Sequence, residues 1–279
     1  MSAPSSQPME PRPIAPRPKG TVQYSNPGRI IVVTGGCNGI GRAIAEGFAA
    51  SSATVIVADV DLALSKTLPA SMHFKQVDVS SEEQCAALVE WTRSTFGGID
   101  VLVNNAAIQP PSSYLRVEDV DRATYEHMVS INLSGYFFMA KYCLKVMRQQ
   151  QSGVVVNISS GQGHRTARQV PVYGPIKAAN ILQAMQWGIE YARDGVRVVS
   201  VSPGAIDTPL VRASLEAQGG EKELANRHPL GRIGRPEEIA HAVIWLASSD
   251  ASFVTATDLS VDGGLKAFGA FADPYPYPQ

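Results

Sequence analysis

Short runs rich in β-branched residues alternate with longer helical patterns along most of this chain, and no other feature restricts its fold as strongly. Near-continuous apolar runs are typical of strands covered on both faces, as in a parallel sheet wrapped by helices. With right-handed crossovers, these elements predict one α/β domain built on a doubly wound, seven-stranded parallel sheet. The expected strands are 29–34, 53–59, 73–78, 100–104, 153–159, 196–202 and 257–262, and the expected helices are 41–50, 81–96, 125–149, 173–194 and 236–248.

The composition excludes several classes of partner. The 279 residues are 44% hydrophobic and 18% charged, with a formal net charge of -1, so nothing attracts the chain to nucleic acid or an anionic membrane. No apolar run reaches the ~20 residues of a membrane span. Cys37, Cys85 and Cys143 are widely spaced and odd in number, so we expect neither a disulfide framework nor a metal site. A cytoplasmic protein is expected.

Both ends of the chain differ from its middle. Residues 1–28 contain seven prolines, which predict a disordered or extended arm, with a polyproline II ligand for a partner as the alternative. The domain is expected to cover 29–266. Residues 267–279 form a C-terminal tail that ends in alternating proline and tyrosine, and this tail could pack on a neighbouring subunit.

A glycine-rich segment joins the first expected strand to the first expected helix. Gly35, Gly39 and Gly41 lie in Thr34-Gly-Gly-Cys-Asn-Gly-Ile-Gly41, a spacing looser than G-x-G-x-x-G. Glycines allow a sharp turn and a close approach of backbone to a pyrophosphate, whose charge is favoured at a helix N-terminus. A plain structural turn would also use glycine, but this context favours dinucleotide binding in a Rossmann fold.

The second expected strand ends in an acidic residue, Asp59. An acidic side chain here can accept hydrogen bonds from an adenosine ribose and would repel a 2′-phosphate. Because Asn38, Val60 and Asp61 offer no cation, the sequence predicts NAD rather than NADP as cofactor. A role for Asp59 as a simple helix cap is the alternative.

Tyr173 and Lys177 are four residues apart, which places them on one face of a helix, and Ser160 lies thirteen residues before the tyrosine. A lysine ammonium beside a phenol favours the phenolate, so we expect the pKa of Tyr173 to fall and the phenol to exchange a proton with a substrate alcohol. A chance pair on a solvated helix face is the alternative. Pro175 is tolerated only in a first turn, so the helix should begin at about Val172.

These motifs together resemble the short-chain dehydrogenase/reductase family in its common ~250-residue form, over about residues 29–266. The family's ordered motifs are matched by Thr34–Gly41, Asn104-Asn-Ala-Ala107, Asn132, Ser160 with Tyr173 and Lys177, and Pro203-Gly204 with Thr208. Ala107 departs from the usual glycine. The cofactor-binding residues that the motifs and the resemblance imply are Gly35, Asn38, Gly39, Ile40, Gly41, Asp59, Asp78, Val79, Asn105, Ala106, Tyr173, Lys177, Pro203, Gly204, Ile206 and Thr208.

The resemblance also implies a mechanism and an assembly. Tyr173 would take the alcohol proton, Ser160 would hold the substrate oxygen, Lys177 would bind the nicotinamide ribose, and Asn132 would hold a water that links Lys177 to solvent. The expected activity is that of an NAD-dependent alcohol dehydrogenase or carbonyl reductase, and the expected assembly is a homotetramer or a dimer. A non-catalytic NAD(H)-binding regulatory or scaffold protein, or an epimerase or dehydratase using the same site, remains an alternative.

We expect the substrate contacts to come from the loops after strands four to six, which are rich in polar residues. Gln109, Gln162 and His164 fall close to the expected nicotinamide site, and Arg165 and Arg168 follow. We expect a small polar secondary alcohol such as a polyol, sugar or cyclic diol, rather than a steroid or an acyl chain. The alternative is that these side chains only face solvent. Residues 210–230 are expected to form a mobile lid.

Overall fold

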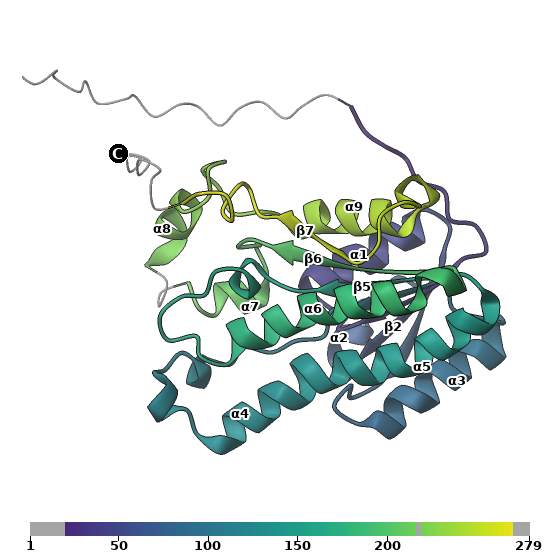
Figure 1. Cartoon of the computed structure of the whole chain (residues 1–279), viewed down its shortest axis with the longest axis horizontal. Coiled ribbons are helices and arrows are strands. Elements are labelled where there is room, and N and C mark those ends of the chain that lie inside the picture. Colours follow the sequence, from purple (N-terminus) through teal and green to yellow (C-terminus); the bar gives the residue numbers. More distant parts are fainter. Residues whose placement is uncertain (1–19, 216–218, 270–279) are drawn as a thin grey trace, which may run out of the picture.

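The computed structural model describes residues 20–215 and 219–269, and a seven-stranded parallel sheet lies at its centre (Figure 1). Its strands run in the order β3-β2-β1-β4-β5-β6-β7, which confirms the predicted doubly wound Rossmann fold. All seven predicted strands are present, with ends that differ by one or two residues from those expected. Their bounds are β1 Ile30–Thr34, β2 Thr54–Asp59, β3 Met72–Gln76, β4 Val101–Asn104, β5 Gly153–Ile158, β6 Val196–Pro203 and β7 Thr257–Val261.

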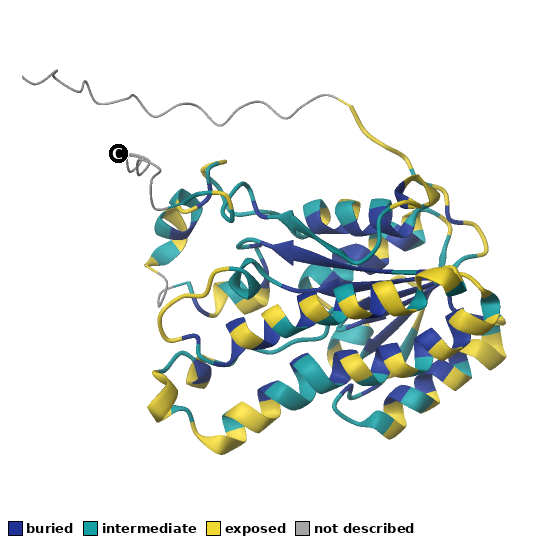
Figure 2. Cartoon of the chain, viewed as in Figure 1, coloured by how far each residue is buried: buried dark blue, intermediate teal, exposed yellow. Residues whose placement is uncertain are grey.

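Helices cover both faces of the sheet. Alternate residues of each strand point to opposite faces, so in β1 Ile31 and Val33 join one core while Ile30 and Val32 join the other. The first core includes α1 (Gly39–Ala50) and α9 (Pro236–Ala247), and the second includes α3 (Glu82–Phe96), α5 (Gly135–Gln150) and α6 (Tyr173–Tyr191). Figure 2 shows the central strands buried and the outer helix faces exposed.

One predicted helix is not regular. The region expected as a single helix over 125–149 consists of α4 (Arg122–Val129), a π-helical turn (Ser130–Ser134) and α5. Asn132 lies in this turn, and its side-chain amide exchanges two hydrogen bonds of 2.8 Å with the backbone of Ile108. A wider turn leaves the apolar periodicity of the flanking helices almost unchanged, so the sequence pattern did not reveal it.

The remaining boundaries follow local chemistry. Helix α6 begins at Tyr173 with Val172 as the N-cap residue, so Pro175 lies in the first turn as predicted. Helix α3 is capped by the Ser81 side chain, which accepts a hydrogen bond from the backbone of Gln84. Three short helices were not predicted: α2 (Leu62–Ser65), α7 (Pro209–Arg212) and α8 (Gly220–Asn226).

The terminal predictions fall largely outside the described residues. Residues 1–19 of the expected arm lie outside the described residues. Residues 20–28 of the arm are described and contain no helix or strand. Of the expected tail, residues 270–279, which include both tyrosines, also lie outside. Within the described ranges no helix combines the length and the apolar character needed to cross a membrane. Cys37, Cys85 and Cys143 are buried and free.

Candidate active site

A cavity of about 590 Å³ opens where the carboxyl ends of the strands meet. Loops after parallel strands collect at one edge of a sheet, so residues distant in sequence lie together there. Tyr173 and Lys177 from α6 face the same cavity as Ser160, which follows β5. Of the other residues predicted from sequence, those that line the cavity are Gly35, Asn38, Gly39, Ile40, Asp59, Asp78, Val79, Asn105, Ala106, Gln109, Gln162, Pro203, Gly204, Ile206 and Thr208.

The glycine loop supplies one wall of the cavity. Gly35 has a φ of +63°, and a Cβ atom there would lie 2.8 Å from the Cα atom of Ala106. Gly41 does not line the cavity, but a Cβ atom there would collide with the carbonyl oxygen of Gly35, so the residue allows α1 to pack beneath the loop. Asn38 makes no side-chain cap on α1. This side chain therefore leaves the first N–H groups of the helix uncapped, and Gly39 and Ile40 of this first turn line the cavity, where an anionic ligand would be favoured.

Asn105 connects this loop to the end of β4. Its Nδ2 atom donates to the carbonyl oxygens of Thr34 and Gly35, at 2.9 and 3.0 Å. In return the Thr34 hydroxyl accepts from the backbone N–H groups of Asn105 and Ala106, at 3.0 and 3.1 Å. These four bonds fix two cavity-lining segments relative to each other.

The carboxylate of Asp59 lies at the far side of the cavity, after β2. Its Oδ2 atom accepts from the backbone N–H of Cys37 at 3.0 Å, and its Oδ1 atom accepts from the backbone N–H of Asp61 at 3.1 Å. The cap of α2 is Asp61, not Asp59, because the Asp61 side chain accepts from Ala63 and Leu64. Arg42 is directed to Glu46 and Thr67 instead of the cavity. No cation among the described residues therefore neutralises this acidic end.

Lys177 is fully buried beneath the catalytic side of the cavity. Its Nζ atom donates to the carbonyl oxygen of Ile158 at 2.8 Å and to the hydroxyl of Tyr136 at 3.1 Å. Burial lowers the pKa of Lys177 to about 7. The ammonium thus exchanges protons near neutral pH, which an exposed lysine does not do.

The pKa of Tyr173 differs from the sequence-based expectation. Burial raises this pKa above its ordinary value, with a further increase from Tyr114 and an opposing contribution from Ser160. The predicted lowering by Lys177 is wrong for this structure, because the lysine nitrogen lies 5.5 Å from the Tyr173 ring centroid and donates to other groups. Desolvation of the phenol therefore dominates.

Asn132 is brought near the site but does not line it. Both polar atoms of its side chain are bonded to Ile108, and its backbone carbonyl accepts from Asn180 Nδ2 at 3.1 Å. The side chain therefore holds the loop after β4 against the π-helical turn. The predicted water held by Asn132 stays a prediction.

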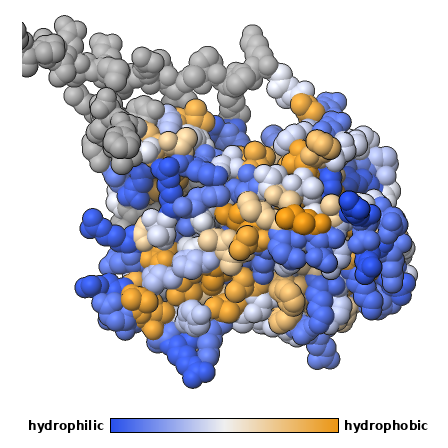
Figure 3. Space-filling view, viewed as in Figure 1, coloured by the Kyte–Doolittle hydropathy of each residue, from blue (hydrophilic) through white to orange (hydrophobic). Residues whose placement is uncertain are grey.

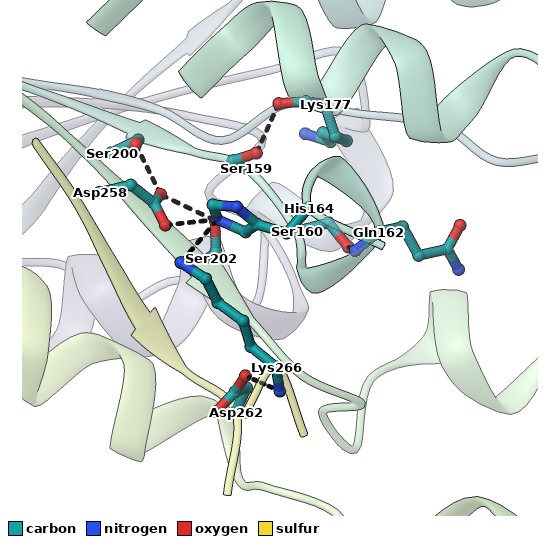
Figure 4. A network of polar contacts seen from close by, with 10 residues as sticks. All are labelled: Ser159, Ser160, Gln162, His164, Lys177, Ser200, Ser202, Asp258, Asp262 and Lys266. Carbon is teal, nitrogen blue, oxygen red and sulfur yellow. Dashed lines mark hydrogen bonds and ion pairs between the residues drawn. The ribbon is translucent and has the colours of Figure 1, made fainter. Parts of the chain in front are cut away.

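His164 was predicted to contact substrate, and the structure places it outside the cavity. Its Nε2 atom lies 2.7 Å from Asp258 Oδ2, whose other oxygen accepts from Ser200 and Ser202 at 2.6 and 2.7 Å (Figure 4). The ring is thus held by a buried carboxylate on β7 and not at the cavity wall, so the structure gives the predicted substrate contact no support. Figure 4 shows Gln162 pointing away from this cluster. Gln162 lines the cavity, and its buried Oε1 atom has no hydrogen-bond partner within the described part of the chain.

Sequence reasoning missed several residues of the cavity wall. His228 is buried, and its Nε2 atom accepts from the backbone N–H of Ala205 at 3.0 Å while Nδ1 lies 2.9 Å from the carbonyl oxygen of Leu224. Burial lowers the pKa of His228 and favours the neutral ring that this pairing requires. The ring joins the predicted lid to the end of β6. No local motif marks such a contact.

Comparisons with known proteins identify the family. The sequence matches the family described as "Enoyl-(Acyl carrier protein) reductase" over residues 35–266. It is 38% identical over 247 residues to cis-4-hydroxycyclohexanecarboxylate dehydrogenase of Sinomonas cyclohexanicum, covering 86% of this chain and 97% of that protein. It is 36% identical over 249 residues to 2,5-dichloro-2,5-cyclohexadiene-1,4-diol dehydrogenase of Sphingobium indicum, covering 86% and 98%.

A solved structure agrees with these relatives. The crystal structure of levodione reductase superposes with a TM-score of 0.83 at 34% identity, covering 88% of this chain and 99% of that one. The chain belongs to the short-chain dehydrogenase/reductase family. It is thus an NAD(P)-dependent oxidoreductase of the common ~250-residue form.

Proposed function

We propose that this protein transfers hydride between NAD and a small polar cyclic secondary alcohol or ketone. The observation that carries the proposal is that one cavity contains Ser160, Tyr173 and Lys177 together with the glycine loop at the start of α1. A protein that only binds a dinucleotide requires the loop but not the three reactive side chains. The chemistry is therefore assigned to this cavity.

The side chains can divide the reaction between them. When NAD is bound, its nicotinamide ring accepts or supplies the hydride. The Ser160 hydroxyl holds the substrate oxygen, and Tyr173 exchanges a proton with it. Burial raises the pKa of Tyr173, so at neutral pH the phenol is protonated and suited to donate to a carbonyl oxygen. Oxidation of the alcohol requires the phenolate, so its rate should increase with pH.

Asp59 supports the preference for NAD. Its carboxylate is held in place by two backbone N–H groups and lines the cavity with Asp61 and Asp78. Three carboxylates around an adenosine ribose would accept hydrogen bonds from its hydroxyls and repel a 2′-phosphate. The cofactor-binding residues proposed here are those predicted from sequence, with Gly41 acting through packing.

Two features support a ring-shaped polar substrate. Gln109 and Gln162 line the cavity, and the unpartnered Oε1 atom of Gln162 provides an acceptor for a hydroxyl. Two of the relatives described above, the cis-4-hydroxycyclohexanecarboxylate and 2,5-dichloro-2,5-cyclohexadiene-1,4-diol dehydrogenases, are named for six-membered-ring alcohols. A cyclic alcohol or diol therefore fits better than an open-chain polyol.

The outer faces of α5 and α6 support a homotetramer or a dimer. Phe137, Leu182 and Ile189 are 47%, 66% and 74% exposed, which is unusual for large apolar side chains on neighbouring helices. Figure 3 shows apolar side chains gathered on this face of the molecule. A second copy of the chain would bury them.

The proposed activity is tested by NADH formation from NAD, and separately NADPH formation from NADP, with a panel of cyclic diols, cyclohexanols, polyols and hydrophobic alcohols. We expect turnover with NAD on cyclic members and its loss in Tyr173→Phe. An isomerised product without NADH would favour an epimerase. Tight NADH binding with no turnover on any member would favour a regulatory binder.

A further inference from the structure

The charges that line the cavity are separated along the sheet. Its carboxylates, Asp59, Asp61 and Asp78, follow strands β2 and β3. Its guanidinium groups, Arg165 and Arg227, follow strands β5 and β6. Because the sheet order is β3-β2-β1-β4-β5-β6-β7, β1 and β4 separate the two sets. The half of the cavity nearest Ser160 and Tyr173 is thus the cationic half.

Arg165 is attached directly to the turn that carries Ser160. The Gly163 N–H donates to the Ser160 carbonyl at 2.9 Å, and the Arg165 N–H donates to the Gly161 carbonyl at 3.1 Å. The Ser160 hydroxyl itself accepts from the Gln162 N–H at 3.1 Å. The backbone of Arg165 therefore has a fixed position relative to the catalytic serine.

The Arg165 side chain is anchored without being neutralised. Its Nη1 atom donates to the carbonyl oxygen of Phe268 at 2.9 Å. Among residues 20–215 and 219–269, no carboxylate forms an ion pair with it. Arg227, by contrast, lies 3.6 Å from Glu223. Arg165 keeps a guanidinium edge that can bind a carboxylate through two parallel hydrogen bonds.

The cofactor phosphates are a less suitable partner for this arginine. A pyrophosphate is expected at the N-terminus of α1, after β1, and two strand positions separate β1 from β5. A neutral cyclic diol would leave the cationic half of the cavity uncompensated. An anionic group on the substrate would balance the positive charge in this half of the cavity.

Building on the function proposed above, we infer that the substrate is a cyclic secondary alcohol or ketone that carries a carboxylate, which Arg165 binds. In the reaction, the carbinol C–H bond would break and its electron pair would pass as hydride to NAD⁺. The hydroxyl O–H bond would break as well, its proton passing to the Tyr173 phenolate and its electron pair forming the C=O bond of the ketone. The carboxylate is unchanged and fixes the orientation of the ring.

The test compares cyclohexanecarboxylate with cyclohexanecarboxamide, which has nearly the same shape and no charge. Binding of each to the enzyme–NADH complex is measured by calorimetry at physiological ionic strength, for the wild type, Arg165→Gln and Arg165→Lys. Arg168→Gln is the matched control, because Arg168 belongs to the same loop and is exposed like Arg165, but does not line the cavity. Neither ligand has a hydroxyl, so the result does not depend on turnover.

We expect the wild type to bind the carboxylate at least about tenfold more tightly than the carboxamide. Arg165→Gln should lower this ratio by about tenfold or more, to near one, Arg165→Lys should restore part of it, and Arg168→Gln should leave it unchanged. Equal binding of the two ligands by the wild type, or equal losses in the Arg165→Gln and Arg168→Gln variants, would overturn the inference.

A separate assay distinguishes this inference from the function on which it rests. Formation of NADH from the neutral cyclohexane-1,4-diol supports the proposed function whatever the outcome of the binding measurement. If the protein prefers the carboxylate ligand but forms no NADH from any ring alcohol, the result counts against the proposed function. The inference that Arg165 binds a carboxylate would still be supported.

Discussion

Replacing Lys177 by methionine should make the cofactor-free protein more stable, and the gain should shrink as the pH rises. The ammonium is buried and its pKa is lowered from 10.5 to about 7 by desolvation. Methionine has a similar length and no charge to desolvate. The carbonyl oxygen of Ile158 keeps a donor in the variant, because the Tyr136 hydroxyl also donates to it at 2.9 Å.

The size of the effect follows from the pKa difference. Each pKa unit corresponds to ~1.36 kcal/mol, so lowering the pKa from 10.5 to about 7 costs the wild type at most ~5 kcal/mol. Below the folded-state pKa, lysine is charged in both states and this cost is complete. Between the two pKa values, the unfolded chain binds more protons than the folded one, so wild-type stability rises with pH. From about pH 6 to about pH 9, the advantage of the variant should fall by about 2 to 3 kcal/mol.

Urea denaturation of both proteins at these two pH values measures the difference, and other titrating groups cancel because they are common to both. Lys145→Met is the control, since Lys145 is exposed on α5 and its removal should give no comparable pH-dependent gain. The Lys177→Met variant should also lose catalytic activity. An advantage that is absent, or that increases with pH, would refute the assignment of a desolvated ammonium.

Substitutions at three further positions test separate parts of the site. Asp59→Asn should lower the ratio of kcat/KM with NAD to that with NADP by about tenfold or more, since it removes the charge that repels a 2′-phosphate; an unchanged ratio would contradict this role. Gly41→Ala should weaken NADH binding by about 100-fold in a fluorescence titration, because its methyl group would displace the Gly35 carbonyl; wild-type affinity would show that the packing is not required. His164→Ala should lower kcat by about tenfold with little change in KM for NAD, because the turn carrying Ser160 loses its bond to Asp258. His164→Gln should recover part of this activity, and an unaffected kcat in His164→Ala would exclude a positioning role.

The sheet could be predicted from sequence because its strands are local patterns. Each run of β-branched residues is short, nearly continuous and bounded by polar or glycine residues, which is enough to define a buried parallel strand. The glycine loop and the Tyr173–Lys177 spacing are equally local. Their chemistry can therefore be predicted from the sequence.

The features that were missed depend on distant contacts. His164 is turned away from the cavity by Asp258, which is 94 residues further along the chain. The π-helical turn at Asn132 depends on its bonds to Ile108, in a loop that precedes it. Sequence spacing placed Lys177 beside Tyr173 but gave no measure of burial, and burial is what determines the pKa values of both residues.

The proposed function requires that one cavity combine NAD binding with proton exchange at Tyr173. The most direct measurement is the rate of NADH formation from NAD and a cyclic secondary alcohol, for the wild type and for Tyr173→Phe with its NADH affinity determined in parallel. We predict turnover by the wild type, a loss of at least about 100-fold in the variant, and similar NADH affinity in both. Turnover that survives the substitution would contradict the account.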